Sequence, residues 1–284
     1  MLYIFLLNLF IVRTILPRLT LDEALEVTKI YSVAGLLPSD KPLITERPFR
    51  VIHHSASAIS IAGGGKNPSP GEISLAHKGI LFMDEFPEFP RNVLEIIRQP
   101  LEDGEITVSR VQGTVTFPAQ FTLIAAMNPC PCGFLTDPEK ECSCLPGQIV
   151  KYQKKISGPI LDRIDMFVEV PRLKVDKLQT KTDTESSETI RERVQYARDV
   201  QTKRFEGTKC SNNKEIKQKD IKHFCPLNDE AENLLKQATM QMQLSGRSYF
   251  RIIKLARTIA DLDHQDTIQT RHIAEALQYR KKDA

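Results

Sequence analysis

The sequence contains no apolar run long enough to cross a membrane. Its most apolar segment is the N-terminal stretch MLYIFLLNLFIV, whereas a spanning helix needs about 20 residues. No basic region precedes this stretch, and no small-residue cleavage site follows it before Arg13 and Pro17, so a secretory signal is not indicated. We interpret the stretch as a buried helix or strand and expect a cytoplasmic protein with no membrane partner.

An excess of charge of one sign is also lacking. Lys and Arg number 39 and Asp and Glu 36, which leaves a net charge of +3; this is too small to predict a nucleic-acid partner by itself. The 41% hydrophobic and 26% charged residues are ordinary for a globular protein. A length of 284 residues suffices for one large domain and a smaller one. The six cysteines need not be paired in a reducing compartment.

A glycine-rich loop ending in Gly-Lys-Ser/Thr, which cradles the phosphates of a nucleotide, is missing from the sequence. The nearest candidate is the run Gly-Gly-Gly-Lys at 63–66. Ser60 stands where the first glycine is required, and Asn67 replaces the hydroxyl residue. Prolines follow at 68 and 70, so the lysine cannot open a helix whose amides would face a phosphate. We interpret this run as a flexible loop.

What the sequence does contain is an apolar segment that ends in two acids. Gly79-Ile-Leu-Phe-Met runs directly into Asp84 and Glu85. The apolar residues predict a buried central strand, and the acids then fall where open α/β sheets bind ligands. This is the form of a Walker B element, whose Asp holds the Mg²⁺ of a nucleoside triphosphate and whose Glu polarises water. A strand that simply ends in solvated acids fits the motif equally well.

Strand patterns are confined to the first two thirds of the chain. Another buried strand is predicted from Phe121 to Met127, directly before Asn128, and a last one at 166–170. Alternating residues around a short turn predict a hairpin at about 104–117. Helices are predicted at 19–32, with Thr20 as N-cap, and at 93–101, closed by Pro100. The region at about 47–76 is rich in Gly, Pro, Ser and His and is expected to be an extended insertion.

Beyond the last predicted strand the sequence becomes polar and then helical. Residues 173–187 have the composition of a linker, and four helical patterns follow between 189 and 280. We therefore expect an α/β core at 1–172, a polar linker at 173–187 and an all-helical lid at 188–284.

Five segments together resemble one family of proteins. They are Pro70–His77, Arg98–Glu105, Met127–Gly133, Gly158–Asp165 and Arg257–Leu262. These segments, in this order, are similar to the magnesium-chelatase-like branch of the AAA+ ATPases, and more narrowly to the ComM/YifB type. Proteins of that type are bacterial and associated with DNA branch migration during natural transformation. The resemblance covers about 14–280 and implies a partial P-loop NTPase core, with the first strand and P-loop missing, and a helical lid.

The resemblance implies that ATP and Mg²⁺ are the cofactors of this core. Asp84 would hold Mg²⁺ and Glu85 would activate the attacking water. Asn128 would be sensor 1, the neutral amide that orients this water near the γ-phosphate; an Asn-Pro turn after a strand is the plainer interpretation.

Three arginines also receive roles from the resemblance. Arg163 would be the arginine finger that reaches into a neighbouring subunit; a surface ion pair with Asp162 or Asp165 is the alternative. Arg247 would be sensor 2 and would bring the lid onto the γ-phosphate, with Arg251 one helical turn on as the other candidate. An exposed helix cation is the alternative for both.

A finger that acts in trans requires a ring, so the resemblance implies self-association into a hexamer. Single-stranded or branched DNA would be bound without sequence preference on the pore side. The expected contacts come from the insertion between His53 and Lys66 and from the hairpin at about 105–116, including Arg110.

Four cysteines form two close pairs, Cys130 with Cys132 and Cys142 with Cys144. Four thiols in this arrangement can close a tetrahedral Zn²⁺ site, although C-x-C is tighter than the common C-x₂-C spacing and a reduced loop without metal is the alternative.

The sequence departs from the pattern of this family at its N-terminus. Relatives carry a Lon-protease-like domain and then the phosphate loop before the segment that matches Thr14, where this sequence has 1–12. We expect a truncated or frameshifted gene product with little or no ATP turnover of its own. Two other functions fit the sequence: a noncatalytic module that binds DNA or joins a ring, and a magnesium-chelatase motor subunit for tetrapyrrole synthesis.

Overall fold

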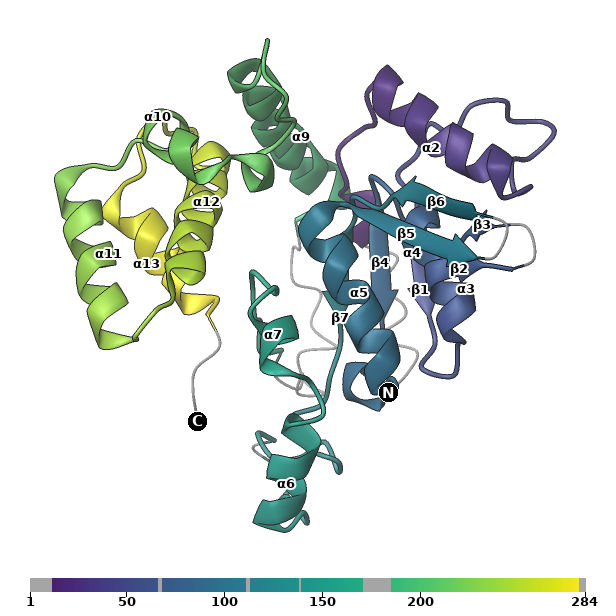
Figure 1. The fold of residues 1–284 in the computed structure, drawn as a ribbon. Coiled ribbons are helices and arrows are strands. Elements are labelled where there is room, and N and C mark those ends of the chain that lie inside the picture. The colour runs from purple at the N-terminus through teal and green to yellow at the C-terminus, as the bar shows by residue number, and fades with distance from the viewer. Residues whose placement is uncertain (1–11, 66–67, 111–112, 138, 171–184, 281–284) are drawn as a thin grey trace. The chain divides into compact units, whose positions relative to one another are not determined.

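The computed structural model describes residues 12–65, 68–110, 113–137, 139–170 and 185–280 (Figure 1). They form two compact units. The sheet unit is Arg18–Arg163, and the helical unit combines 12–17, Ile164–Val170 and 185–280. Residues 1–11 of the predicted N-terminal element and residues 173–184 of the predicted linker lie outside the described residues. Within those residues, no helix has the length and apolar character needed to cross a membrane.

A three-stranded parallel sheet forms the centre of the sheet unit. Its order is β1 (Phe49–Ile52), β4 (Ile80–Met83) and β7 (Thr122–Ala125). The four residues of β4 are between 0 and 3% exposed, because a central strand packed on both faces must be apolar throughout. The predicted fold class, a partial α/β core followed by a helical region, is confirmed.

The sheet unit also contains helices. They are α2 (Leu21–Val33), α3 (Ala58–Ala62), α4 (Glu72–Leu75), α5 (Arg91–Asp103), α6 (Pro146–Gln153) and α7 (Gly158–Leu161). The predicted N-cap of α2 is confirmed, since Thr20 Oγ1 accepts from Glu23 N at 3.2 Å and Glu23 Oε2 accepts from Thr20 N at 3.2 Å. This capping box satisfies amides that have no partner inside the helix.

The prediction that Pro100 closes the next helix is wrong. Helix α5 continues through Pro100 to Asp103 and ends at Gly104, whose φ of 72° is left-handed. A proline in the last turn removes only its own N–H, whereas a glycine can adopt the conformation that terminates the helix. Gly104 therefore sets the end of α5.

The predicted extended insertion at 47–76 contains regular structure. It includes β1, α3 and α4, and a short antiparallel pair, β2 (Gly63–Gly64) with β3 (Ser69–Pro70). A Cβ built on Gly63 would lie 2.4 Å from the carbonyl oxygen of Ser69, so only glycine allows the two backbones to approach. The glycine run is thus used for close packing rather than for a flexible loop, although Lys66 lies outside the described residues.

A hairpin follows α5. Strands β5 (Glu105–Arg110) and β6 (Gly113–Pro118) pair antiparallel over their whole length. Ile106, Val108 and Phe117 are buried, whereas threonine hydroxyls lie on the exposed face, where Thr107 Oγ1 and Thr116 Oγ1 are 3.1 Å apart. The alternation of apolar and polar residues therefore separates a packed face from a solvated one.

The predicted last strand at 166–170 is absent from the structure. The segment belongs to the helical unit, where Phe167 N donates to Tyr279 O at 2.7 Å. Met166, Val168 and Val170 are 43, 64 and 78% exposed. An apolar alternating segment becomes a strand only if a neighbouring strand pairs with it, and none of the described residues does so here.

The helical unit packs around α12 (Gly246–Leu262). Its other helices are α9 (Ser187–Arg204), α10 (Ile221–Phe224), α11 (Asp229–Gln241) and α13 (Thr270–Gln278). Apolar residues of α12 such as Ile252 and Ala256 meet Leu235 of α11 and Ile273 of α13 in one core. Amphipathic helices with one apolar face require this arrangement.

A buried ionic network ties α12 to α9. Asp261, with a side chain 0% exposed, pairs with Arg204 of α9 and with Arg257, one turn earlier and 1% exposed. Asn213 Nδ2 also donates to Asp261 Oδ2 at 2.8 Å. The Arg257–Leu262 segment is therefore a structural brace of the helical unit.

Candidate functional site

The two acids of the Walker B-like segment lie at the carboxyl end of β4. Asp84 is half-buried, and Glu85 is exposed with a φ of 51°. Asp84 Oδ1 accepts from Glu85 N at 2.8 Å, and Phe86 N donates to Ala126 O at 2.9 Å. These bonds turn the chain sharply after the strand and hold a non-glycine residue in a left-handed conformation, a strain typical of functional sites.

Glu85 is paired with a histidine that follows the neighbouring strand β1 by two residues. His54 Nδ1 lies 3.0 Å from Glu85 Oε2. Strand β1 pairs with β4 in parallel, with Ile52 opposite Met83. The residues two positions further along each strand direction, at 54 and 85, therefore lie side by side. The sequence placed His54 in the insertion and gave no sign of this pairing, because it depends on strand order and register.

Asn128 lies three residues beyond β7 and is exposed. Since Met83 pairs with Ala125 in the parallel sheet, Asn128 and the acids of β4 lie at the same sheet edge. The predicted sensor 1 residue and the predicted Walker B pair thus follow two adjacent parallel strands, β7 and β4.

Tyr152 of α6 was not identified from the sequence. Burial and the negative charge of Glu88 raise the pKa of Tyr152, and a backbone hydrogen bond with Asn128 opposes this rise. Gln153 Nε2 also donates to Pro129 O at 3.2 Å. Helix α6 therefore holds the main chain around Asn128 from the side.

Arg163 follows α7 and is bound within its own unit. Its side chain is 8% exposed and pairs with Glu102 of α5 through Nε at 3.1 Å, and Nη1 donates to Pro159 O at 2.6 Å. The partner is thus Glu102 rather than the nearby aspartates that the sequence suggested. An action in trans would require Arg163 to leave this carboxylate.

The other two arginines lie at the start of α12, in the helical unit. Arg247 is exposed, and Arg251 Nη1 lies 3.4 Å from Asp165 Oδ1. Residues four apart share one helix face, so both face the same way.

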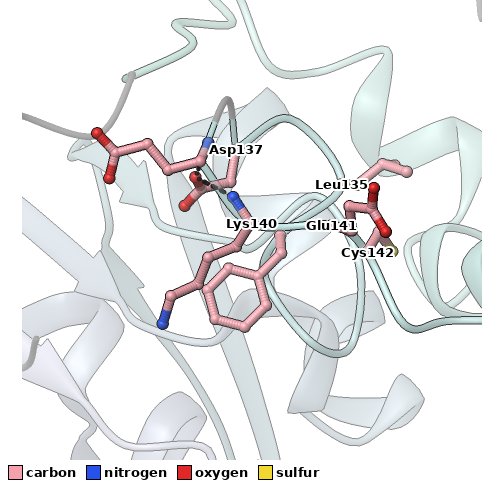
Figure 2. Close-up of a pocket in the computed structure, with 7 residues that line it drawn as sticks. Leu135, Asp137, Lys140, Glu141 and Cys142 are labelled. Carbon is pink, nitrogen blue, oxygen red and sulfur yellow. Dashed lines mark hydrogen bonds between the residues drawn. The ribbon is translucent and has the colours of Figure 1, made fainter.

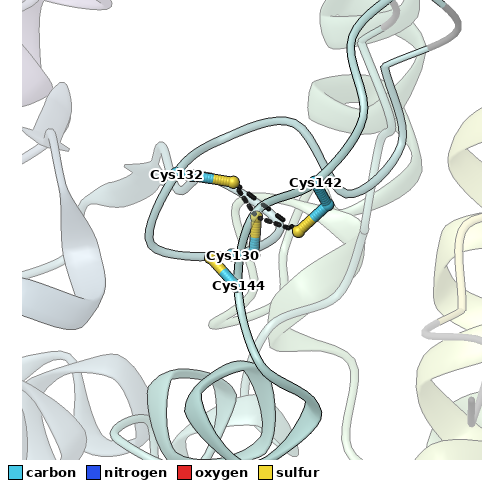
Figure 3. A group of neighbouring side chains, drawn as sticks. All are labelled: Cys130, Cys132, Cys142 and Cys144. Carbon is cyan, nitrogen blue, oxygen red and sulfur yellow. Dashed lines mark hydrogen bonds between the residues drawn. The ribbon is translucent and has the colours of Figure 1, made fainter.

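The four predicted metal-ligating cysteines gather in the loop between β7 and α6 (Figure 3). The thiols of Cys130, Cys132, Cys142 and Cys144 all lie within 4.8 Å of one another. All four are free thiols.

A pocket of about 380 Å³ lies in the same loop (Figure 2). Its lining includes the acids Asp137, Glu139 and Glu141 and one cation, Lys140, whose Nζ lies 5.0 Å from the centre of the Phe134 ring. An acidic lining repels phosphates, so this pocket does not fit a nucleotide.

Comparison with known protein families accounts for nearly all of the chain. Residues 9–178 match the family model described as magnesium chelatase, subunit ChlI, and residues 184–280 match that of its C-terminal part. The chain belongs to the magnesium-chelatase family. The family resemblance inferred from the sequence is thereby confirmed.

Relatives of the ComM/YifB type match this magnesium-chelatase family member over most of its length. "Competence protein ComM" of Haemophilus influenzae is 45% identical over 269 residues, which cover 94% of the chain and 51% of that protein. "Uncharacterized protein YifB" of Escherichia coli is 42% identical over 271 residues, 95% of the chain and 52% of that protein. The "magnesium-chelatase 38 kDa subunit" of Acidiphilium rubrum is 23% identical over 221 residues, 75% of the chain and 55% of that protein. The chain spans about half the length of these curated relatives.

Proposed function

We propose that this chain is a motor module of a magnesium-chelatase-type AAA+ ATPase that remodels DNA. The observation that carries the proposal is the sheet edge, where Asp84 and Glu85 follow β4 and Asn128 follows the adjacent parallel strand β7. A metal ligand, a water-activating carboxylate and an orienting amide at one sheet edge are three of the parts that phosphoryl transfer to water requires.

The residues at this edge fit a hydrated Mg²⁺. Asp84 presents a half-buried carboxylate, and Mg²⁺ is commonly held by one or two carboxylates together with phosphate oxygens and water. When bound, Mg²⁺ neutralises the charge of the ATP phosphates. Glu85 then accepts the proton of the attacking water, and Asn128 holds that water in line. His54, whose Nδ1 lies 3.0 Å from Glu85 Oε2, orients the Glu85 carboxylate.

The remaining roles concern assembly. We assign Arg163 as the arginine finger, which would leave Glu102 and contact the γ-phosphate bound to a neighbouring subunit. We assign Arg247, with Arg251 as the second candidate, as the lid residue that contacts the γ-phosphate. These assignments imply a ring, and a hexamer is the assembly proposed for it.

The substrate we propose is single-stranded or branched DNA, bound through its backbone. The name of the Haemophilus relative, a competence protein, and the ComM/YifB resemblance support this assignment. The hairpin β5–β6 and the region from His53 to Lys66 are the proposed contacts. Lys66 and the side chain of Arg110 lie outside the described residues, so the proposal rests on the place of these elements in the chain. Backbone binding predicts an affinity for DNA of any sequence that falls steeply with salt.

A paramagnetic ion tests the metal site directly. With ATP present, Mn²⁺ in place of Mg²⁺ should broaden the amide NMR signals of residues 84–86 and 126–128. Asp84→Asn should remove this broadening. The matched control is Glu88→Gln, an exposed acid four residues on whose Oε2 lies 2.7 Å from Lys155 Nζ, and it should leave the broadening intact. Broadening that is absent, or that survives Asp84→Asn, contradicts the proposed site.

A second candidate function is a noncatalytic module that joins a ring or binds DNA. It is favoured by one observation, the lack of a Gly-Lys-Ser/Thr loop in the 284 residues. DNA binding without Mn²⁺·ATP broadening would support it. The third function, a tetrapyrrole-type chelatase subunit, is less favoured because the Acidiphilium subunit is 23% identical whereas ComM is 45% identical.

A further inference from the structure

The loop between β7 and α6 holds the densest group of metal-binding side chains among the described residues. We propose that Cys130, Cys132, Cys142 and Cys144 bind one Zn²⁺ tetrahedrally and that this ion fixes the main chain around Asn128. The inference does not depend on nucleotide binding.

The distances between the sulfur atoms match a single bound ion. A tetrahedral Zn²⁺ with Zn–S bonds of about 2.3 Å places its four sulfurs about 3.8 Å apart. Cys130 Sγ lies 3.4 Å from Cys132 Sγ and 3.7 Å from Cys142 Sγ, and the latter two are 3.6 Å apart. A disulfide would require about 2.05 Å, and a sulfur–sulfur distance of that size occurs in none of these pairs. The thiols are therefore spaced for a shared ion rather than for a disulfide.

Backbone amides orient the thiols. Cys132 Sγ accepts hydrogen bonds from the amides of Phe134 and Ser143, and Cys142 Sγ accepts one from the amide of Cys144. The amide of Cys132 in turn donates to Cys144 Sγ. Such second-shell bonds hold metal ligands in place and offset the negative charge of thiolates. These contacts hold the four sulfur atoms of the loop in one group.

The choice of ion follows from the donor set. Four thiolates favour Zn²⁺, Cu(I) or iron–sulfur chemistry. An iron–sulfur cluster inserts several irons and sulfides between its cysteines. Three of the sulfurs here lie 3.4 to 3.7 Å apart and all four within 4.8 Å, which leaves room for one ion only. A site with four protein ligands keeps no open position for substrate, so the ion is structural.

The position of the site defines its effect. Cys130 is 0% exposed and lies two residues after Asn128, and the second cysteine pair directly precedes α6, whose Tyr152 and Gln153 contact the main chain at 128–129. Between β7 and α6 the described residues form no helix or strand. A bound Zn²⁺ would join the two ends of this loop and position Asn128.

Metal content tests the proposal on the whole chain. Protein purified without chelator should contain one equivalent of zinc by elemental analysis, and Co²⁺ exchanged into it should give the visible absorption of a tetrahedral thiolate site. Cys130→Ser and Cys142→Ser should each lower the zinc content at least several-fold. The control is Cys210→Ser, a thiol of the helical unit that donates to Glu215 O at 3.5 Å, and it should keep the full equivalent.

A second measurement covers the case in which the serine variants do not fold. Stripping zinc from the unmodified chain should shift the amide NMR signals of Asn128 and Tyr152 and leave those of α12 unchanged, and added zinc should restore them. The proposal is overturned if the purified chain holds no zinc and takes up none, if iron is found in its place, if the cysteines form disulfides under reducing purification, or if the Asn128 signal does not respond.

Discussion

At the scale of single residues, the unusual backbone of Glu85 marks the candidate site. Its φ of 51° is left-handed, a conformation that costs an L-residue about 1–2 kcal/mol. The bonds around it, from Glu85 N to Asp84 and from Phe86 N to Ala126, impose this geometry. The consequence is that the carboxylate meets His54 rather than continuing the line of the strand.

This strain can be measured by substitution. We expect Glu85→Gly to be more stable than Glu85→Ala by about 1 kcal/mol in denaturant unfolding, because glycine adopts positive φ without a steric penalty. Glu88 provides the control, since it lies in the 3₁₀ helix Phe86–Glu88 without positive φ. At position 88 the alanine variant should be more stable than the glycine variant. An alanine variant at position 85 as stable as the glycine variant would show that the backbone is unstrained.

His77 predicts a pH dependence of stability. It is 2% exposed, Nδ1 accepts from Gln120 N at 3.1 Å and Nε2 lies 3.0 Å from Glu26 Oε2. Burial lowers its pKa from 6.5, and the Glu26 hydrogen bond only partly opposes this. The unfolded chain therefore binds a proton more readily, so stability falls as pH decreases below about 6.5.

A single linked proton limits the slope to about 1.4 kcal/mol per pH unit. His77→Gln should reduce this slope between neutral and mildly acidic pH in denaturant unfolding, while lowering stability at pH 7 through the lost contacts. His53, an exposed histidine bonded to Ser55 at 2.8 Å, supplies the control, and His53→Gln should leave the slope unchanged. An unaltered slope in His77→Gln would assign the pH dependence to other groups.

At the scale of elements, the buried acid Asp261 of α12 is the centre of the ionic network of the helical unit. Removing Asp261 leaves Arg257 buried without its counter-ion and also removes a partner of Arg204 and Asn213. We expect Asp261→Ala to destabilise the helical unit by about 3–5 kcal/mol. Glu232→Ala should have little effect, because its pair with Lys236 on α11 is about half exposed.

Methyl NMR signals of Ile252 and Ile273, both in the core of this unit, would follow its unfolding separately from that of the sheet unit. Equal losses in the two variants would contradict the structural role assigned to Asp261.

The elements also show where sequence patterns are sufficient. The apolar run before Asp84 determined β4 because burial on both faces leaves no choice of residue type. The prediction of a strand at 166–170 was wrong, because this segment alternates as a strand does but is hydrogen-bonded to the end of α13. The prediction that Pro100 ends a helix was also wrong, because the effect of a proline depends on its position within the helix. Strand pairing and helix ends depend on neighbours that a local pattern does not contain.

At the scale of the whole molecule, the chain matches about half the length of its ComM and YifB relatives. A motor of this kind needs a phosphate cradle as well as a Walker B pair, and the 284 residues contain no Gly-Lys-Ser/Thr loop. We therefore propose the ATPase activity for the assembled motor and expect little or none from these 284 residues alone.

We expect the purified chain to hydrolyse little or no ATP, with or without forked DNA, in a phosphate-release assay. Glu85→Gln should then match the unmodified chain. A measured turnover that Glu85→Gln abolishes and Glu88→Gln preserves would refute the prediction, since it would show that the phosphates are held by other residues of this chain.

The sequence by itself determined the family, the α/β-then-helical order and the acid-ended strand, because apolar runs and short motifs are local properties of the chain. Only the tertiary structure decided that His54 meets Glu85, that Tyr152 supports Asn128 and that four thiols converge. Each of these contacts joins segments separated along the chain, and their meeting follows from strand order, register and loop closure. The pairing of Glu85 with His54 and the convergence of the four thiols are thus consequences of folding.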